Sequence, residues 1–258
     1  MATKSATHEE LWIRRFHATK QDGVRLVCFP HAGGSASFFF PMSKVLSPAM
    51  DVLAVQYPGR QDRRMEKGID NIPDLADEAF EALKSQLDCR MVLFGHSMGA
   101  VLAFEVARRL ERETDAKVMG LFASGRRAPS RYRDESVHLR DDEGIVAELK
   151  LMSGTDAALL GDDEILRMIL PAIRSDYAAI ESYRCEPGAT VACPITVLVG
   201  DSDPKTSLEE ATAWSGHTTG PFELRTFQGG HFFLAHHQAE VTNLIRASSI
   251  SALGGSPR

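Results

Sequence analysis

The stretch LFGHSMGA, residues 93–100, places a serine between two glycines at the point where an apolar run ends and a helical pattern begins. The run reads as a buried strand, and residues 98–112 have the apolar spacing of a helix. In that context a G-x-S-x-G pentapeptide holds its serine on a sharp turn with the hydroxyl exposed above the sheet. Side chains at positions 95 and 99 would collide with the flanking elements, which favours glycine there. We therefore expect Ser97 to be a nucleophile.

The rest of the chain alternates between short apolar runs and helical patterns. Such alternation predicts right-handed βαβ units and an α/β fold, with a mostly parallel, doubly wound sheet. Several of the runs are apolar almost throughout, which is typical of strands that are covered on both faces. The expected strands are 24–29, 51–56, 91–95, 118–124, 195–200 and 222–227, and the expected helices between them include 73–87, 98–112 and 236–247.

One segment interrupts this alternation. From residue 126 to about residue 183 there is no convincing strand, and residues 143–152 and 163–183 are helical in period, with Pro171 expected to kink or divide the second helix. The segment is too long for an ordinary connection, so we expect a helical lid over the carboxyl edge of the sheet. We thus expect one domain over residues 1–258, with the lid at about 126–183 and frayed ends at 1–10 and 248–258.

A serine hydroxyl needs a base that is itself oriented by a carboxylate, and in this architecture the chain order is serine, acid, histidine. His231 follows a predicted strand and two glycines that permit a close approach, so it is the expected base. Two acids follow the strand 195–200. Asp201 comes directly after it, in a position to satisfy turn amides, and Asp203 lies one short turn further out. We favour Asp203 as the partner of His231 and keep Asp201 as the alternative.

The tetrahedral intermediate of acyl transfer needs two N–H donors for its oxyanion. The Met98 amide lies at the start of the helix after the serine, where unpaired N–H groups favour an anion. The second donor is expected from the loop after the first core strand, CFPHAGGSASFF (28–39), where Gly33 and Gly34 allow the backbone close to the substrate. Ala32 is the candidate in that loop.

Composition excludes several other classes of protein. The 258 residues carry a net charge of −6 with no Lys/Arg-rich block, so nucleic acid is not an expected partner. No run of eighteen apolar residues predicts a membrane span, and the first fifteen residues lack the apolar core of a secretion signal. The four cysteines show no C-x-x-C spacing, which fits reduced thiols in a cytoplasmic protein. No cluster has metal-ligand spacing, and no phosphate-binding P-loop is present, so no metal or cofactor is expected.

The motifs FPHAGGSASFF, QYPGRQDR, FGHSMGA, LPAIRSDY, GDSDP and GGHFFL, in that order, resemble the type II thioesterases, discrete α/β-hydrolases that accompany polyketide synthases and nonribosomal peptide synthetases. The resemblance runs from about Cys28 to His231. It implies an α/β-hydrolase fold and hydrolysis of acyl groups from the phosphopantetheine arm of acyl or peptidyl carrier proteins, which clears stalled or aberrant units. It also implies a Ser97–Asp203–His231 triad, with Ala32 and Met98 as oxyanion donors.

Carrier proteins tend to be acidic, so RQDRR (60–64) and RRAPSRYR (126–133) are candidates for a basic docking rim. Three alternatives remain: a thioesterase that releases a finished medium-chain acyl product, a small-molecule carboxylesterase on the same scaffold, and a binding protein that has lost catalysis. The complete triad argues against the last of these. The expected oligomeric state is a monomer.

Overall fold

A seven-stranded sheet forms the centre of the protein, as seen in a computed structural model that describes residues 7–19, 23–152 and 162–254. The strand order is β1-β3-β2-β4-β5-β6-β7, and every neighbouring pair from β3 to β7 is parallel. In chain order the strands are β1 (Ile13–Arg14), β2 (Val24–Phe29), β3 (Asp51–Val55), β4 (Arg90–His96), β5 (Val118–Ser124), β6 (Ile195–Gly200) and β7 (Phe222–Phe227).

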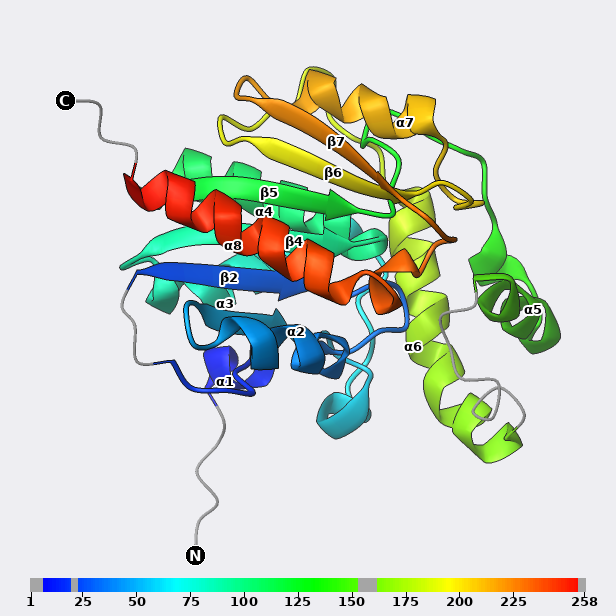
Figure 1. Cartoon of the computed structure of the whole chain (residues 1–258). Helices are drawn as coiled ribbons and strands as arrows, with labels where there is room; N and C mark the ends of the chain where they lie inside the picture. Colours follow the sequence, from blue (N-terminus) through cyan, green and yellow to red (C-terminus); the bar gives the residue numbers. More distant parts are fainter. Residues whose placement is uncertain (1–6, 20–22, 153–161, 255–258) are drawn as a thin grey trace, which may run out of the picture.

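Helices cover both faces of this sheet (Figure 1). One apolar core lies between the sheet and α3 and α4, and a second lies on the opposite face beneath α2 and α8. Successive residues of β2 alternate between the two cores, which explains why its sequence is apolar almost throughout. The helices are α1 (His8–Trp12), α2 (Phe40–Leu46), α3 (Ile72–Leu83), α4 (Met98–Glu113), α5 (Asp142–Met152), α6 (Asp163–Ser182), α7 (Leu208–Thr212) and α8 (Gln238–Gly254).

The six expected strands are confirmed, with small differences at the ends of β3 and β4. The prediction missed β1, a two-residue strand that pairs antiparallel with β3 and is too short to show a period. The expectation of a frayed end over residues 1–10 was also wrong for its described part. Thr7 and Glu10 form a capping box that starts α1, and Trp12 is buried. At the other end α8 continues through residues 248–254, while residues 1–6 and 255–258 lie outside the described part.

The two helices between β5 and β6 lie beyond the carboxyl ends of the strands, beside the sheet (Figure 1). They share a small apolar core that includes Ile145, Leu149, Leu170 and Ile173. Within the described residues of 126–183 there is no strand, and 153–161 lie outside those residues. The expectation was that Pro171 kinks or divides this helix. Helix α6 runs from Asp163 to Ser182 without a break, so division is wrong, and Pro171 lies at an exposed position.

Candidate active site

The turn between β4 and α4 holds Ser97 in a conformation that few residues other than glycine adopt. Its φ is 55° and its ψ is −119°, a combination that costs of order 1–3 kcal/mol. The flanking glycines make the turn possible. A Cβ at position 95 would lie 2.0 Å from the Gly99 carbonyl oxygen, and one at position 99 would lie 2.0 Å from the Phe29 carbonyl oxygen. Neither backbone atom can move aside, so both glycines are required by close packing.

His231 and Asp203 meet at the carboxyl ends of β6 and β7. The imidazole Nδ1 lies 2.9 Å from Oδ2 and 3.0 Å from Oδ1 of the carboxylate, which is fully buried. Asp203 also accepts a hydrogen bond from the Lys205 amide, which fixes the carboxylate in place. Asp201 is exposed and accepts from the Gly229 amide and the Ser202 hydroxyl. It therefore holds the turn before His231, while Asp203 is the carboxylate that reaches the imidazole.

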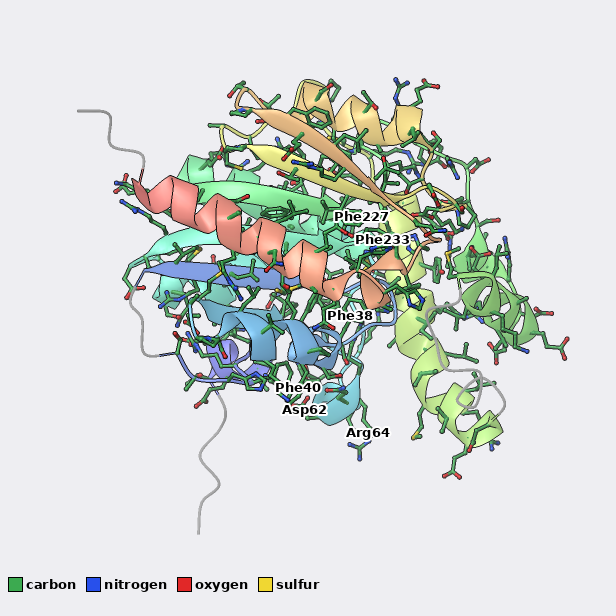
Figure 2. The ribbon with its side chains drawn as sticks, in the orientation of Figure 1. Phe38, Phe40, Asp62, Arg64, Phe227 and Phe233 are labelled. Atoms are coloured by element: carbon green, nitrogen blue, oxygen red, sulfur yellow. The ribbon has the colours of Figure 1, made fainter. Side chains whose placement is uncertain are left out.

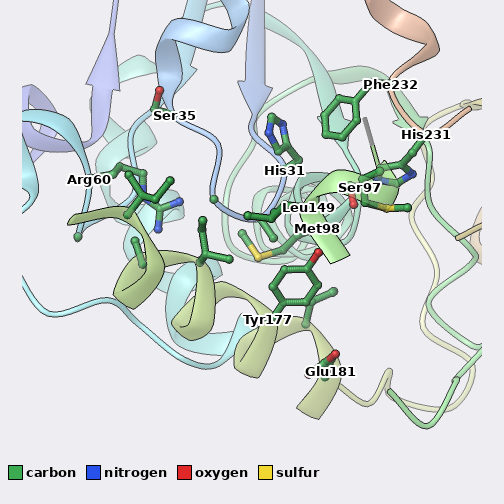
Figure 3. A pocket seen from close by; sticks show the side chains of 18 of the residues that line it. His31, Ser35, Arg60, Ser97, Met98, Leu149, Tyr177, Glu181, His231 and Phe232 are labelled. Atoms are coloured by element: carbon green, nitrogen blue, oxygen red, sulfur yellow. The ribbon is translucent and has the colours of Figure 1, made fainter. Parts of the chain in front are cut away.

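A pocket of about 470 Å³ brings the remaining candidates together. Ser97, Met98, Ala32 and His231 all line it, and Figure 3 shows the serine and the imidazole at the same end. The opposite wall belongs to α5 and α6 and is largely apolar. Met98 is the first residue of α4, so its amide has no carbonyl partner within the helix. The pocket thus brings Ser97, His231 and the two residues expected to supply backbone amides next to an apolar chamber.

The described residues hold no group of three or more histidine, cysteine, aspartate or glutamate side chains placed to bind a metal ion. Across 7–19, 23–152 and 162–254 no helix combines the length and the apolar character that a membrane crossing requires.

The model of the thioesterase domain family matches residues 24–249 of this chain. The chain belongs to this family. Two curated relatives are a probable cadicidin biosynthesis thioesterase of Streptomyces griseus, 57% identical over 234 residues, and thioesterase PikA5 of Streptomyces venezuelae, 50% identical over 236 residues. Each alignment covers 91% of this chain, but 64% of the cadicidin protein and 84% of PikA5.

Solved structures agree with this assignment. The type II thioesterase BorB from the borrelidin biosynthetic cluster superposes with a TM-score of 0.88 at 48% identity, covering 95% of this thioesterase and 100% of BorB. YbtT, a type II thioesterase from the yersiniabactin NRPS/PKS pathway, gives a TM-score of 0.82 at 29% identity, with 93% and 99% covered. The expected resemblance to type II thioesterases and the expected α/β-hydrolase fold are therefore confirmed.

Two further histidines surround the imidazole of this thioesterase. The rings of His96 and His231 are 5.1 Å apart, and His31 lies 5.9 Å from His96. Burial, reinforced by the nearby His231, lowers the pKa of His31 to about 3 and holds the pKa of His96 well below its usual range. Both therefore stay neutral near pH 7 and add no positive charge beside His231.

A buried ion pair fastens α6 to the loop that carries Ala32. The Arg60 guanidinium donates two hydrogen bonds to Asp176, at 2.7 and 2.8 Å, and the two side chains are only 7% and 1% exposed. Asp176 also accepts from the Gly33 amide at 2.7 Å, while Arg60 donates to the Gly34 carbonyl. The loop, the segment after β3 and helix α6 are thereby joined by one carboxylate.

The arginines of the expected docking rim are mostly engaged elsewhere. Arg60 is in the buried pair above, and Arg63 is buried, with its guanidinium over the Trp12 ring and paired with Glu66. Arg127 pairs with Glu135 and Arg133 with Glu210. These ion pairs leave the two segments less basic than their sequences imply, and the docking rim stays a prediction. Arg64, which lines the pocket and projects outward in Figure 2, remains exposed.

Sequence reasoning missed Asp176 and Arg60 as parts of the site. Asp176 lies in the quoted motif LPAIRSDY, to which no role was given, and Arg60 lies in RQDRR, which was assigned to the docking rim. The available signal was that Asp176 lies next to Tyr177 on the apolar face of a predicted helix. A carboxylate buried on such a face needs a cation nearby.

Proposed function

We propose that this protein hydrolyses acyl thioesters on the phosphopantetheine arm of acyl or peptidyl carrier proteins, and that it removes stalled or aberrant acyl units from a polyketide or nonribosomal peptide assembly line. The observation that carries the proposal is the Asp203–His231 pair, whose imidazole lines the pocket that also holds the strained Ser97. The relatives support the substrate class, because the cadicidin protein, BorB and YbtT are named as thioesterases of biosynthetic pathways.

The residues act in two half-reactions. His231 takes the proton from the Ser97 hydroxyl, whose oxygen attacks the thioester carbonyl, and the imidazolium then gives that proton to the departing thiol. Water, deprotonated by the same imidazole, attacks the acyl-enzyme and releases the acid. Asp203 holds the imidazole tautomer and stabilises the imidazolium without taking the proton. The Ala32 and Met98 amides stabilise each oxyanion, at roughly 3–4 kcal/mol per donor in the transition state.

The segment 126–183 acts as a lid within a single domain. Its helices supply apolar side chains to the chamber wall, among them Leu149, Met152, Ile169 and Ile173. An apolar wall accepts acyl chains without a specific partner and limits water around the thioester. Loose selection of this kind suits an enzyme that clears many different units.

The test is mass spectrometry of carrier proteins loaded with a panel of acyl groups, before and after incubation with the enzyme. The proposal predicts that short acyl groups of several kinds are removed and that free holo-carrier appears. Removal of one long chain alone would favour product release. Free esters cleaved much faster than acyl-pantetheine would favour a small-molecule esterase.

A further inference from the structure

The guanidinium of Arg126 lines the active-site pocket without a partner among the described residues. Arg126 follows Gly125 at the end of β5, where an added Cβ on the glycine would lie 3.5 Å from the His231 ring. Its backbone is fixed, because its carbonyl accepts a hydrogen bond from the indole of the buried Trp214. Its Nε atom is buried and makes no hydrogen bond. Arg126 thus lines the pocket with a guanidinium that no acceptor in the described part of the chain satisfies.

The other charged side chains of the pocket wall have partners or lie at its exposed rim. Arg60 pairs with Asp176, and Lys205 pairs with Glu135 and Glu148. Glu181 is held by His138 and by two backbone amides. Arg64 is exposed.

The charges around Arg126 do not neutralise it. Glu135 is already shared by Arg127 and Lys205, and the neighbouring Arg133 is paired with Glu210. Burial, together with the like charge of Arg127, lowers the pKa of Arg126 to about 9, so the guanidinium is still protonated at neutral pH. A partly buried cation without a partner is costly, and an acceptor that enters with the ligand recovers that cost.

We propose that Arg126 forms an oxygen-recognition subsite for the acyl group, favouring acyl units that carry a carbonyl, hydroxyl or carboxylate oxygen beyond the thioester carbon over plain alkyl chains. This inference rests on the proposed thioesterase activity. The planar guanidinium offers a fork of donors that suits such oxygens. The phenol of Tyr177 lines the same pocket and points from α6 toward the start of α4 (Figure 3), so it offers a second polar group to the same acyl unit.

The test compares kcat/KM for butyryl-, acetoacetyl- and methylmalonyl-pantetheine with the wild-type enzyme, Arg126→Leu and Arg126→Lys. Butyryl has no extra oxygen, acetoacetyl adds a neutral carbonyl, and methylmalonyl adds a carboxylate. Arg126→Leu should reduce the two oxygenated substrates roughly 10- to 100-fold relative to butyryl, the range for a hydrogen bond to a charged group. Arg126→Lys should restore the carboxylate substrate more than the carbonyl substrate, because it keeps the charge but loses the fork.

The exposed pocket-lining residue supplies the control. Arg64→Leu should change all three substrates by the same factor. An equal loss of kcat/KM on all three substrates in Arg126→Leu, or no loss on any of them, overturns the subsite.

Labelling of Ser97 by a fluorophosphonate and an unchanged or higher melting temperature show that the Arg126→Leu variant is folded. If the wild-type enzyme cleaves none of the three thioesters, the proposed function fails. If it cleaves them, but Arg126→Leu leaves the ratio of kcat/KM between oxygenated and butyryl substrates unchanged, only the subsite fails.

Discussion

Arg60 and Asp176 form a bidentate ion pair across 116 positions of sequence, and the same carboxylate accepts the amide of Gly33. The pair thus joins helix α6, part of the proposed lid, to the loop that carries the expected oxyanion donor Ala32. Because the Gly33 amide is bonded to Asp176 on α6, a displacement of α6 would shift Gly33, the residue after Ala32. The position of α6 and the position of the Ala32 loop are therefore coupled through one buried contact.

Removal of one partner of this pair should be strongly destabilising. Asp176→Asn leaves the guanidinium buried without its counter-charge, at a cost of roughly 3–5 kcal/mol. The difference in the free energy of unfolding between this variant and wild type, measured by urea titration, gives this cost. Glu223→Gln, in the exposed pair with Arg225, is the matched control and should cost less than about 1 kcal/mol. An Asp176→Asn protein as stable as wild type would show that the pair does not hold α6 against the loop.

The strain at Ser97 predicts that loss of activity and gain of stability can go together. Ser97→Gly removes the hydroxyl and also the Cβ that makes φ of 55° unfavourable, so it should raise the free energy of unfolding by about 1 kcal/mol. Ser97→Ala keeps the Cβ and should gain little. Thermal unfolding of the two inactive variants isolates the backbone contribution. Equal melting temperatures would argue that the turn is unstrained.

The two acids after β6 should differ sharply in their effect on turnover. Asp203→Asn retains the shape of the side chain but disturbs the tautomer and loses the charge next to His231, so kcat should fall about 10⁴-fold. Asp201→Asn affects an exposed turn contact with Gly229, and we expect a change of less than tenfold. Steady-state hydrolysis of one acyl-pantetheine substrate by both variants checks this order. The reverse order would exchange the roles of the two residues.

The buried histidines predict a loss of stability on acidification. The pKa of His96 is lower in the folded protein than in the unfolded chain, so the unfolded state binds more protons and stability rises with pH. The contribution is complete above the unfolded pKa near ~6.5 and is lost below it, at up to ~1.4 kcal/mol per pH unit for each such histidine. His31 contributes a second loss of stability on acidification, which continues until the pH reaches its folded pKa of about 3.

Urea titrations at intervals between pH 7 and pH 5 measure this slope before most carboxylates titrate. His96→Asn should make the slope shallower, whereas His236→Asn, at an exposed position, should leave it unchanged. A slope that His96→Asn does not alter would mean that His96 takes up a proton as readily in the folded protein as in the unfolded one.

The sequence predicted those parts of the fold that depend on local pattern. Apolar runs located β2 to β7, and the spacing in GHSMG required Gly95 and Gly99, whose Cβ positions the structure shows to be occupied by backbone. Order along the chain indicated which strand ends carry Asp203 and His231. The choice between Asp201 and Asp203 depended on two residues of turn geometry, which pattern alone cannot resolve.

What the sequence did not predict depends on contacts between distant segments. Arg60 read as a surface base in RQDRR because its partner, Asp176, lies on another element. From the sequence, Arg126 was assigned to a basic rim. What distinguishes it from its neighbours is its place in the pocket lining, next to Arg127, which is paired with Glu135. Charge in a sequence does not show whether a side chain is solvated or paired; burial and partners decide that.

The central claim is that Ser97 carries the acyl group between the thiol and water. Rapid-quench mass spectrometry of enzyme mixed with acyl-pantetheine tests it most directly. We predict a mass increase of one acyl group on the peptide containing Ser97, persisting longer in enzyme with Asp203→Asn and absent from Ser97→Ala. Thioester cleavage by Ser97→Ala at the wild-type rate, with no acylated peptide in either protein, would contradict the claim.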